Sequence, residues 1–420
     1  MSDLTALQFL RSTTAVRERC SNILAAALAG SDPFFTVNLA ALGGAAQRVN
    51  QLIDKRFGNK PIPYHARWRH FEAGGIDRLQ ALPECSDNAE RARREIDLAV
   101  TAVLLDAGSG AQWKFTEATT GWSGGRSEGL GVAAFHAFAS GLFGGSAGSP
   151  RAQADALQRL KIADISDAFQ VSAHNPLVGL EGRTALLTRL ANALTARPDL
   201  FGTAARPGHM FDYLTDSGRN KVVSAASILS VVLEGLGPIW LTESKLGGVA
   251  LGDVWQHKNA GGERVESGQG GAQGEGTGLN PESAGWVPFH KLSQWMTYSL
   301  LEPFERAGIT VTGLDQLTGL PEYRNGGLLI DEGVLQVKSP AMLELTYEVG
   351  DAFIISWRAL TVALLDHLAV EVRALRGLTA EQLPLACVLE GGSWAAGRQT
   401  AQELRGGLPP VQVNSDGTVF

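Results

Sequence analysis

The chain is poor in cysteine and in charge for its length. Its 420 residues include only three cysteines, Cys20, Cys85 and Cys387, which lie far apart. A disulfide framework or a zinc ribbon needs closely spaced pairs of cysteines, so neither fits this sequence. Charged residues make up 19% of the chain and hydrophobic residues 44%. We expect a large core in one big domain or two tightly joined lobes, in a reducing compartment.

The sequence also lacks a basic excess, a signal peptide and a membrane span. Its 36 Lys and Arg residues stand against 43 Asp and Glu residues, which gives a net charge of −7. A phosphate backbone selects basic surfaces, so this balance argues against non-specific binding to nucleic acid. No charged segment followed by an apolar one opens the chain, and no apolar run reaches the length of a membrane span. We therefore expect a cytoplasmic protein that acts on a small molecule, without nucleic-acid or membrane partners.

Apolar residues recur at helical spacing along most of the chain. This pattern predicts a mainly α fold, with β-structure confined to short pieces such as the alternating segment 409–420. We divide the chain into an N-terminal helical lobe, 1–240, and a C-terminal helical lobe, 241–420, which carries the motifs described below. The glycine-rich stretch 258–285 cannot bury much apolar surface, so it is predicted to be a mobile loop. It is either a lid over a site or an idle insertion.

One site-like cluster follows a turn at residues 319–324. Gly319 and Pro321 interrupt the apolar pattern, and Glu322, Tyr323 and Arg324 come directly after the proline. A carboxylate, a phenol and a guanidinium therefore emerge together from a turn. The alternative is a loop between two helices whose charged side chains face water.

A second cluster lies between Lys245 and His257. Lys245 precedes Asp253 by eight residues, and His257 follows Asp253 by four. On a helix, Asp253 and His257 would share a face. Glycines at positions 247, 248 and 252 weaken the helix prediction itself. Asp253 stands in an apolar run before Trp255, and a carboxylate in such a place needs a partner or a function.

Two segments of the N-terminal half offer groups that suit a ligand. Residues 56–71 are bounded by prolines and mix cations with aromatic rings, so Arg67 and His70 could bind an anion. Residues 107–117 are rich in small side chains, and Trp113 offers a flat face to a planar group. Each segment has an equally ordinary explanation, namely a wet surface loop and a tight turn with Trp113 in the core.

These motifs together resemble the uracil catabolism protein 4 family of fungi and bacteria. The resemblance spans nearly the whole chain and rests on the segments 60–71, 106–114, 251–255, 319–324 and 415–420. It implies a place in a pathway that opens uracil after ribosylation and releases urea. The step implied for this component is the cleavage of ribosylurea.

A more distant resemblance is to the queuosine salvage proteins, which are nucleotide N-glycosidases. Those proteins have an all-helical fold akin to helix-hairpin-helix DNA glycosylases. They carry a Lys eight residues before an Ala-Asp-x-Trp motif and, further on, an Asp-Tyr-Arg motif. This chain has Lys245 eight residues before Asp253, with Gly252 in place of the Ala, and Glu322 in place of the Asp.

The second resemblance implies roles for the charged residues. N-glycosidic cleavage builds positive charge on the ribose, which a nearby carboxylate stabilises. Glu322 is expected to be the general base or the cation stabiliser, and Asp253 to bind ribose hydroxyls or to position the water. Lys245 is expected to meet a 5′-phosphate, and no cofactor or metal is implied. The other expected substrate-binding residues are Tyr323, Arg324, Trp255, His257, Trp113, His70 and Arg67.

Two other functions stay open at the level of sequence. A metal-dependent amide or ureide hydrolase could draw ligands from His65 and His70, which lie five apart, or from Asp253 and His257. A non-catalytic partner of the pathway would instead bury Glu322 and Asp253 in ion pairs without any cavity.

Overall fold

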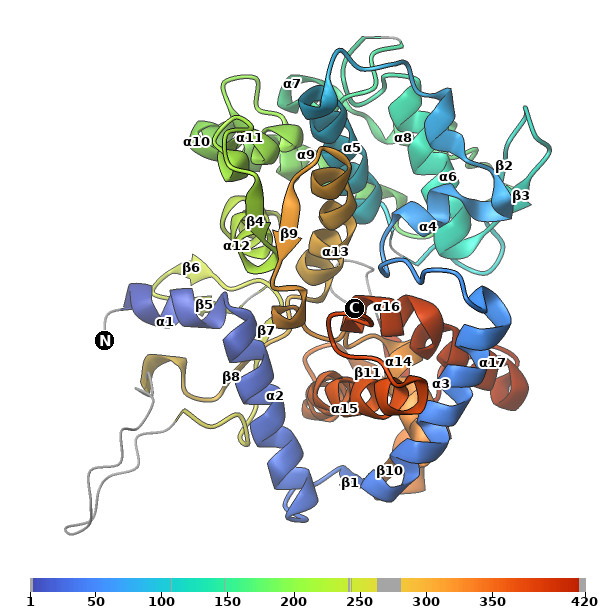
Figure 1. Ribbon diagram of the computed structural model, residues 1–420, viewed down its shortest axis with the longest axis vertical. Helices are drawn as coiled ribbons and strands as arrows, with labels where there is room; N and C mark the ends of the chain where they lie inside the picture. The colour runs from blue at the N-terminus through green and yellow to red at the C-terminus, as the bar shows by residue number, and fades with distance from the viewer. Residues whose placement is uncertain are drawn as a thin grey trace. The chain divides into compact units, whose positions relative to one another are not determined.

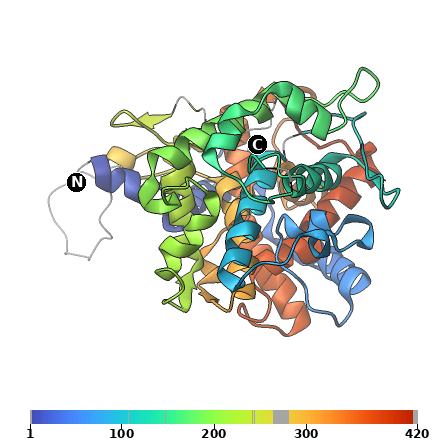
Figure 2. The same ribbon diagram turned by 90° about the horizontal axis from the view of Figure 1, so that it is seen from above.

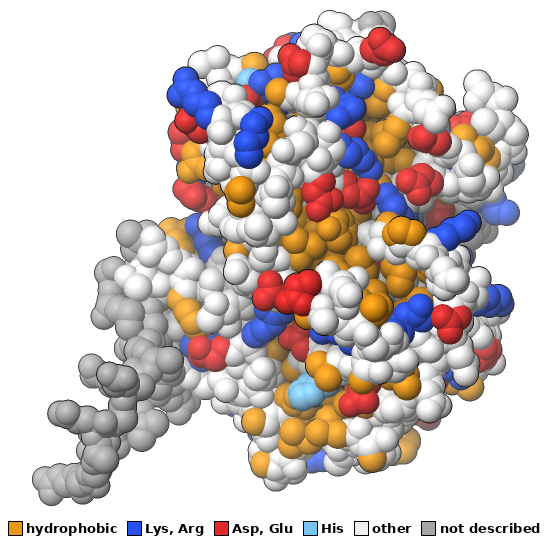
Figure 3. Space-filling view, viewed as in Figure 1, with side chains coloured by type: hydrophobic (Ala, Val, Ile, Leu, Met, Phe, Trp, Pro, Cys, Tyr) orange, Lys and Arg blue, Asp and Glu red, His pale blue; other side chains and the backbone are white. Residues whose placement is uncertain are grey.

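The computed structural model describes residues 3–106, 108–146, 148–240, 242, 244–262 and 281–414. Most of these residues lie in helices, and the strands form short two-stranded pairs (Figure 1), so the predicted mainly α fold is confirmed. Residues 263–280 of the predicted loop and residues 415–420 of the predicted C-terminal strand lie outside the described residues. On the face shown in Figure 3, acidic and basic side chains are interspersed rather than gathered by sign.

The chain groups into two compact units whose boundaries follow packing rather than sequence order. The first unit holds residues up to 63, residues 242–291 and residues 315–414. The second unit holds residues 64–241 and 292–314. The chain passes from one unit to the other after residues 63, 241, 291 and 314, and the lobe boundary was expected after residue 240. The first unit combines helices near the N-terminus with C-terminal elements, and hydrophobic periodicity does not reveal such packing.

The core of the first unit is built around helix α15 (Ala352–Arg376), against which α2 (Thr13–Leu28) and α3 (Leu42–Phe57) pack. Helix α15 is long and apolar enough to cross a membrane by length and composition, so the expectation that no apolar run reaches that length is wrong. Its most apolar window is 83% buried inside the protein. This burial is typical of a core helix.

The other elements of the first unit are short. Ser12 separates the first two helices by capping α2, where its hydroxyl accepts from the Ala15 N–H at 3.1 Å. The remaining elements are α1 (Asp3–Leu10), β1 (Phe35–Val37), η1 (Leu39–Ala41), β5 (Lys245–Leu246), β6 (Val249–Ala250), β7 (Val254–Gln256), η6 (Pro281–Ser283), β8 (Trp286–Pro288), α14 (Tyr323–Asp331), β10 (Leu335–Val337), η8 (Pro340–Glu344), β11 (Thr346–Glu348), α16 (Leu385–Val388), η9 (Leu389–Ser393), α17 (Trp394–Arg405) and β12 (Gln412–Asn414).

Strand pairing in this unit joins distant parts of the chain. Strand β1 pairs antiparallel with β10, with Phe35 opposite Val337, and β7 pairs antiparallel with β8, with Trp255 opposite Val287. Strand β12 pairs parallel with β11, so the described part of the predicted C-terminal strand does close on a neighbour.

In the second unit, α5 (Asn88–Leu104) and α13 (Lys291–Arg306) lie side by side in both views (Figures 1 and 2). Arg306 of α13 reaches Glu95 of α5 at 3.1 Å. The remaining elements are α4 (Trp68–Phe71), η2 (Ala73–Gly75), η3 (Arg78–Ala81), β2 (Phe115–Thr116), β3 (Ser123–Gly124), α6 (Arg126–Ala139), α7 (Ala154–Arg159), α8 (Ile162–Ala168), α9 (Leu180–Ala196), α10 (Pro198–Phe201), η4 (Pro207–His209), α11 (Met210–Thr215), β4 (Val222–Ser224), α12 (Ala225–Leu236), η5 (Gly237–Ile239), β9 (Thr310–Thr312) and η7 (Leu314–Gln316), whose last residues belong to the first unit.

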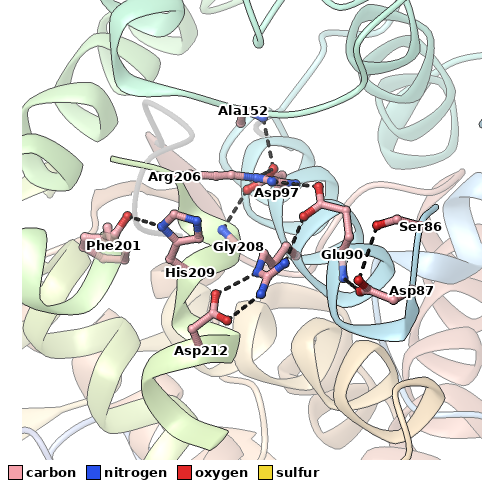
Figure 4. Close-up of polar contacts among 11 residues, drawn as sticks. Ser86, Asp87, Glu90, Asp97, Ala152, Phe201, Arg206, Gly208, His209 and Asp212 are labelled. Carbon is pink, nitrogen blue, oxygen red and sulfur yellow. Dashed lines mark hydrogen bonds and ion pairs between the residues drawn. The ribbon is translucent and has the colours of Figure 1, made fainter. Parts of the chain in front are cut away.

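A buried polar network fixes α5 in the second unit (Figure 4). Asp97 is fully buried and accepts from Arg206 Nε at 2.5 Å and from the Gly208 N–H at 2.7 Å. Arg93, one helical turn earlier, grips Asp212 of α11 through Nε and Nη2 at 2.8 and 2.7 Å. Because these contacts tie α5 to α11 and to the segments around Ala152 and Arg206, we assign the network to folding.

The closest helix contact in the first unit lies between α14 and α17. A Cβ added at Gly397 would fall well inside contact distance of the Arg324 carbonyl oxygen. A Cβ at Gly44 of α3 would meet open space. Gly397→Ala is therefore expected to lower the free energy of unfolding by about 1–3 kcal/mol through overpacking. Gly44→Ala should leave it unchanged or raise it by about 0.5–1 kcal/mol through helix propensity.

Urea unfolding of the two variants measures this difference. Equal effects of the two substitutions would contradict the close approach of α14 and α17.

Candidate active site

The segment that carries Lys245, Asp253 and His257 is not a helix, so the helical spacing proposed for it is wrong. It forms the hairpin β5–β6, with Lys245 opposite Ala250, followed by strand β7. Gly247 and Gly248 turn the hairpin at φ values of 54° and 81°, and Gly252 adopts 73° before β7. Glycine adopts positive φ without steric cost, which is why three glycines in this run favour turns over a helix.

The Asp253 carboxylate is held by four donors. Arg358 of α15 grips it in a bidentate manner at 2.8 and 2.7 Å, the Trp255 indole N–H donates at 2.7 Å, and the Lys291 backbone N–H donates at 3.0 Å. A carboxylate offers about four acceptor positions, so these contacts saturate it. Burial acts to raise the pKa of Asp253, but Arg358 and the two other donors outweigh burial and hold the pKa below its usual value.

His257 belongs to a buried hydrogen-bonded chain. Its Nδ1 accepts from the Asn259 N–H at 3.2 Å, so the ring proton lies on Nε2. Nε2 therefore donates to the Ser356 hydroxyl at 2.9 Å, and this hydroxyl donates to Asp32 at 3.0 Å. Burial lowers the pKa of His257, although Asp32 acts to raise it. The imidazole is thus held neutral and in one orientation.

Glu322 caps the start of helix α14. Its carboxylate accepts from the Asn325 N–H at 2.7 Å and from the Arg324 N–H at 3.0 Å. These bonds use two of its acceptor positions, and the side chain is half-buried. A carboxylate at a helix start is also favoured by the helix dipole.

Arg324 provides a nearly buried cation beside this carboxylate. Its guanidinium carbon lies 4.2 Å from the Trp394 ring centroid and 5.3 Å from that of Tyr323. Only 8% of the residue is exposed, and no described residue forms a hydrogen bond or an ion pair with its guanidinium. The start of α14 therefore carries a carboxylate, an aromatic face and a cation whose N–H groups are available.

The two predicted carboxylates hold different places in the first unit. Asp253 contacts α15 through Arg358, whereas the α14 segment contacts α15 through Trp357, whose ring would meet a Cβ at Gly326. Successive residues of a helix point about 100° apart. Asp253 and helix α14 therefore contact different sides of α15.

The other predicted residues lie in varied surroundings. Lys245 is exposed on the β5–β6 hairpin, and the Trp255 ring packs on Gly350. In the second unit, Trp113 is 1% exposed, donates to the Phe169 carbonyl oxygen at 2.9 Å and stacks on the Phe169 ring. These contacts match the alternative in which Trp113 serves the core.

Sequence reasoning missed the partners of the predicted residues. Arg358, Ser356 and Trp394 were not assigned to the site. A charged residue within the apolar pattern of α15 was the signal available for Arg358, since a buried charge needs a counter-charge. Among the described residues, no three His, Cys, Asp or Glu side chains are grouped so that they could hold a metal ion.

The Asp253–Arg358 pair provides a stability test. Asp253→Asn leaves a buried Arg358 without its counter-charge, so the free energy of unfolding should fall by about 3–5 kcal/mol. Because the folded-state pKa of Asp253 is lowered, the carboxylate stabilises the fold above its unfolded pKa. The difference from wild type should therefore hold at neutral pH and shrink in acid, once the pH falls below the ordinary value of 3.8.

Asp366→Asn is the matched control, because Asp366 pairs with Arg17 at 3.0 Å with both side chains about one-third exposed. Its loss should cost less than about 1 kcal/mol. Chemical unfolding at several pH values measures both variants, and equal losses would contradict a buried role for the Asp253 carboxylate.

Comparison with known proteins places the whole chain among full-length relatives. A family model described as a protein of unknown function (DUF1688) matches residues 9–420. Protein urg3 of Schizosaccharomyces pombe is 36% identical over 433 aligned residues, which cover 100% of both chains. Uracil catabolism protein 4 of Lachancea kluyveri is 34% identical over 449 aligned residues, which cover 99% of each chain.

Proposed function

The chain belongs to the DUF1688 family, and we propose that it is a hydrolase of uracil catabolism that cleaves the N-glycosidic bond of ribosylurea or its 5′-phosphate. The products are urea and ribose or ribose 5-phosphate. A core like that of helix-hairpin-helix glycosylases and a cytoplasmic location belong to the same proposal.

The observation that carries the proposal is the group at the start of α14. Glu322 keeps two acceptor positions beyond its capping bonds, and Arg324 lies against Trp394 at 4.2 Å with its N–H groups available. A half-buried carboxylate and a nearly buried cation two residues apart suit a substrate that develops positive charge on its sugar and carries an anion elsewhere. Both residues belong to the Glu-Tyr-Arg motif.

The chemistry assigned to this group is a simple hydrolysis. The bond between C1′ of the ribose and the urea nitrogen breaks, and its electron pair and a proton go to the nitrogen. The hydroxyl of a water molecule adds to C1′, and the other proton of this water goes to Glu322 or to solvent. Glu322 stabilises the cationic ribose and orients the water. Arg324 and the exposed Lys245 attract a 5′-phosphate.

Asp253 takes a positioning role in this scheme. Since its four acceptor positions are occupied, it is not available as a second base. It fixes the Trp255 indole and the Arg358 guanidinium, and through them strand β7 against α15. In the proposed chemistry, therefore, Glu322 is the one carboxylate that acts on the substrate.

Turnover by a Glu322→Gln variant tests the assignment. Gln keeps the size of the side chain but removes the negative charge next to the ribose, so kcat should fall by at least about 100-fold. Urea release from synthetic ribosylurea and its 5′-phosphate, with free sugar counted in parallel, measures the rate. The free energy of unfolding should fall by only about 0.3–1 kcal/mol, because Gln keeps an oxygen that can accept the capping bonds but loses the charge that the helix dipole favours.

Asp87→Asn is the matched control for the capping effect. Asp87 caps α5 in the second unit and accepts from the Glu90 N–H at 2.7 Å. Asp87→Asn likewise removes a capping charge but keeps an accepting oxygen, and the variant should keep full turnover. Full turnover by Glu322→Gln would remove Glu322 from the chemistry. Absence of urea release from both compounds by the wild-type protein would contradict the glycosidase, and loss of turnover on chelation would favour a metal-dependent hydrolase.

A further inference from the structure

Arg67 of the second unit is a fully buried cation with unused hydrogen-bond donors. The residue precedes α4 and is 0% exposed, and its own backbone N–H donates to the Ser299 hydroxyl at 2.9 Å. Burial lowers the pKa of Arg67, and Asp106 partly opposes this effect. A guanidinium in such a place costs free energy unless its charge and its N–H groups are matched.

Only one end of the guanidinium is matched. Its Nη1 lies 3.0 Å from His70 Nδ1, 3.1 Å from the Ser127 carbonyl oxygen and 3.1 Å from Asp106 Oδ1. Nε and Nη2 are buried, and no described residue accepts a hydrogen bond from either. Three of the five N–H bonds of this guanidinium therefore lack an acceptor.

The unused edge has a defined chemical preference. In the same unit, Arg78 uses Nε and Nη2 to grip the two oxygens of Glu117 at 2.8 and 2.9 Å. Arg93 uses the same two atoms on Asp212. This edge of an arginine fits two oxygens of one carboxylate or phosphate. Arg67 presents the same two atoms, Nε and Nη2, but no described acidic side chain accepts hydrogen bonds from them.

An aromatic side chain with an unmatched donor of its own lies near this guanidinium. The guanidinium carbon of Arg67 is 5.7 Å from the centroid of the Trp295 ring, which also meets the His70 ring edge to face at 6.0 Å. The Trp295 indole N–H is itself buried, and no described residue accepts its hydrogen bond. Buried polar groups in folded proteins are nearly always satisfied. Two neighbouring side chains with unmatched donors therefore point to a missing acceptor.

The wall behind Arg67 is closely packed. A Cβ at Gly131 of α6 would lie 2.6 Å from the His70 Cβ and 3.5 Å from the Arg67 guanidinium carbon. Helix α6 thus covers this side of the pair and fixes the direction of the guanidinium. Such a fixed arginine binds an oxyanion with little loss of side-chain entropy.

We propose that Arg67 and Trp295 form a binding site for the oxyanion of a small molecule, a carboxylate or a phosphate monoester. The anion takes two hydrogen bonds from Nε and Nη2 of Arg67 and a third from the Trp295 indole. His70 and Asp106 hold the other end of the guanidinium. The site uses no residue of the Glu322 group, so its test is a binding measurement and does not depend on turnover.

Titration calorimetry of the full-length protein tests the site with three probes: inorganic phosphate, ribose 5-phosphate and acetate. At least one should bind saturably, and the ranking of the three separates a phosphate site from a carboxylate site. Arg67→Lys keeps the charge but removes the two-pronged edge, so it should weaken the best probe by at least about tenfold. Trp295→Phe keeps the ring but removes the N–H, and should weaken the same probe about tenfold.

Arg197→Lys is the matched control, since Arg197 already grips Asp199 through Nε and Nη2 at the surface of the same unit. It should leave the affinity unchanged. Circular dichroism of each variant confirms folding, and Trp295→Phe carries the test if Arg67→Lys does not fold. Saturable binding that neither Arg67→Lys nor Trp295→Phe weakens overturns the proposal. Absence of saturable binding by the wild type overturns it as well, because the donors then face only water.

Discussion

The first unit depends on neutralising one charge inside its most apolar helix. Arg358 is 1% exposed in the second turn of α15, where an unpaired guanidinium would cost several kcal/mol. Asp253 supplies the counter-charge in bidentate geometry and, in the same position, accepts from Trp255 and from the Lys291 N–H. One carboxylate thereby ties strand β7, the start of α13 and α15 together.

Local patterns predicted the elements of the fold better than their partners. The periodicity of α5, α9 and α15 was visible in the sequence because each helix buries a wide apolar face. The helix prediction for Lys245–His257 was wrong because the apolar residues of this segment have no helical period. Its three glycines adopt positive φ and form turns. The need of Asp253 for a partner was also visible. The identity of that partner was not, because it lies 105 residues away in the chain.

The predicted site residues show the same limit. Glu322 was chosen for its charge, and its capping role became clear only from the two N–H groups of α14 that it accepts. Trp113 and Arg67 both come from segments rich in aromatic or small residues. Trp113 is satisfied by Phe169, whereas Arg67 keeps an unmatched edge. Sequence composition cannot distinguish these cases, because the difference depends on which backbone carbonyls and carboxylates surround the side chain.

Three buried arginines of this chain differ in how their charge and their N–H groups are matched. Arg358 has its carboxylate in place and holds the core together. Arg324 lies against the Trp394 and Tyr323 rings, and Arg67 is matched at Nη1 but not at Nε or Nη2. A buried donor without an acceptor destabilises the fold. Such a donor is retained in a protein when a ligand provides the acceptor. We therefore propose ligand contacts at Arg324 and Arg67 rather than at the Asp253 carboxylate, whose acceptor positions are occupied.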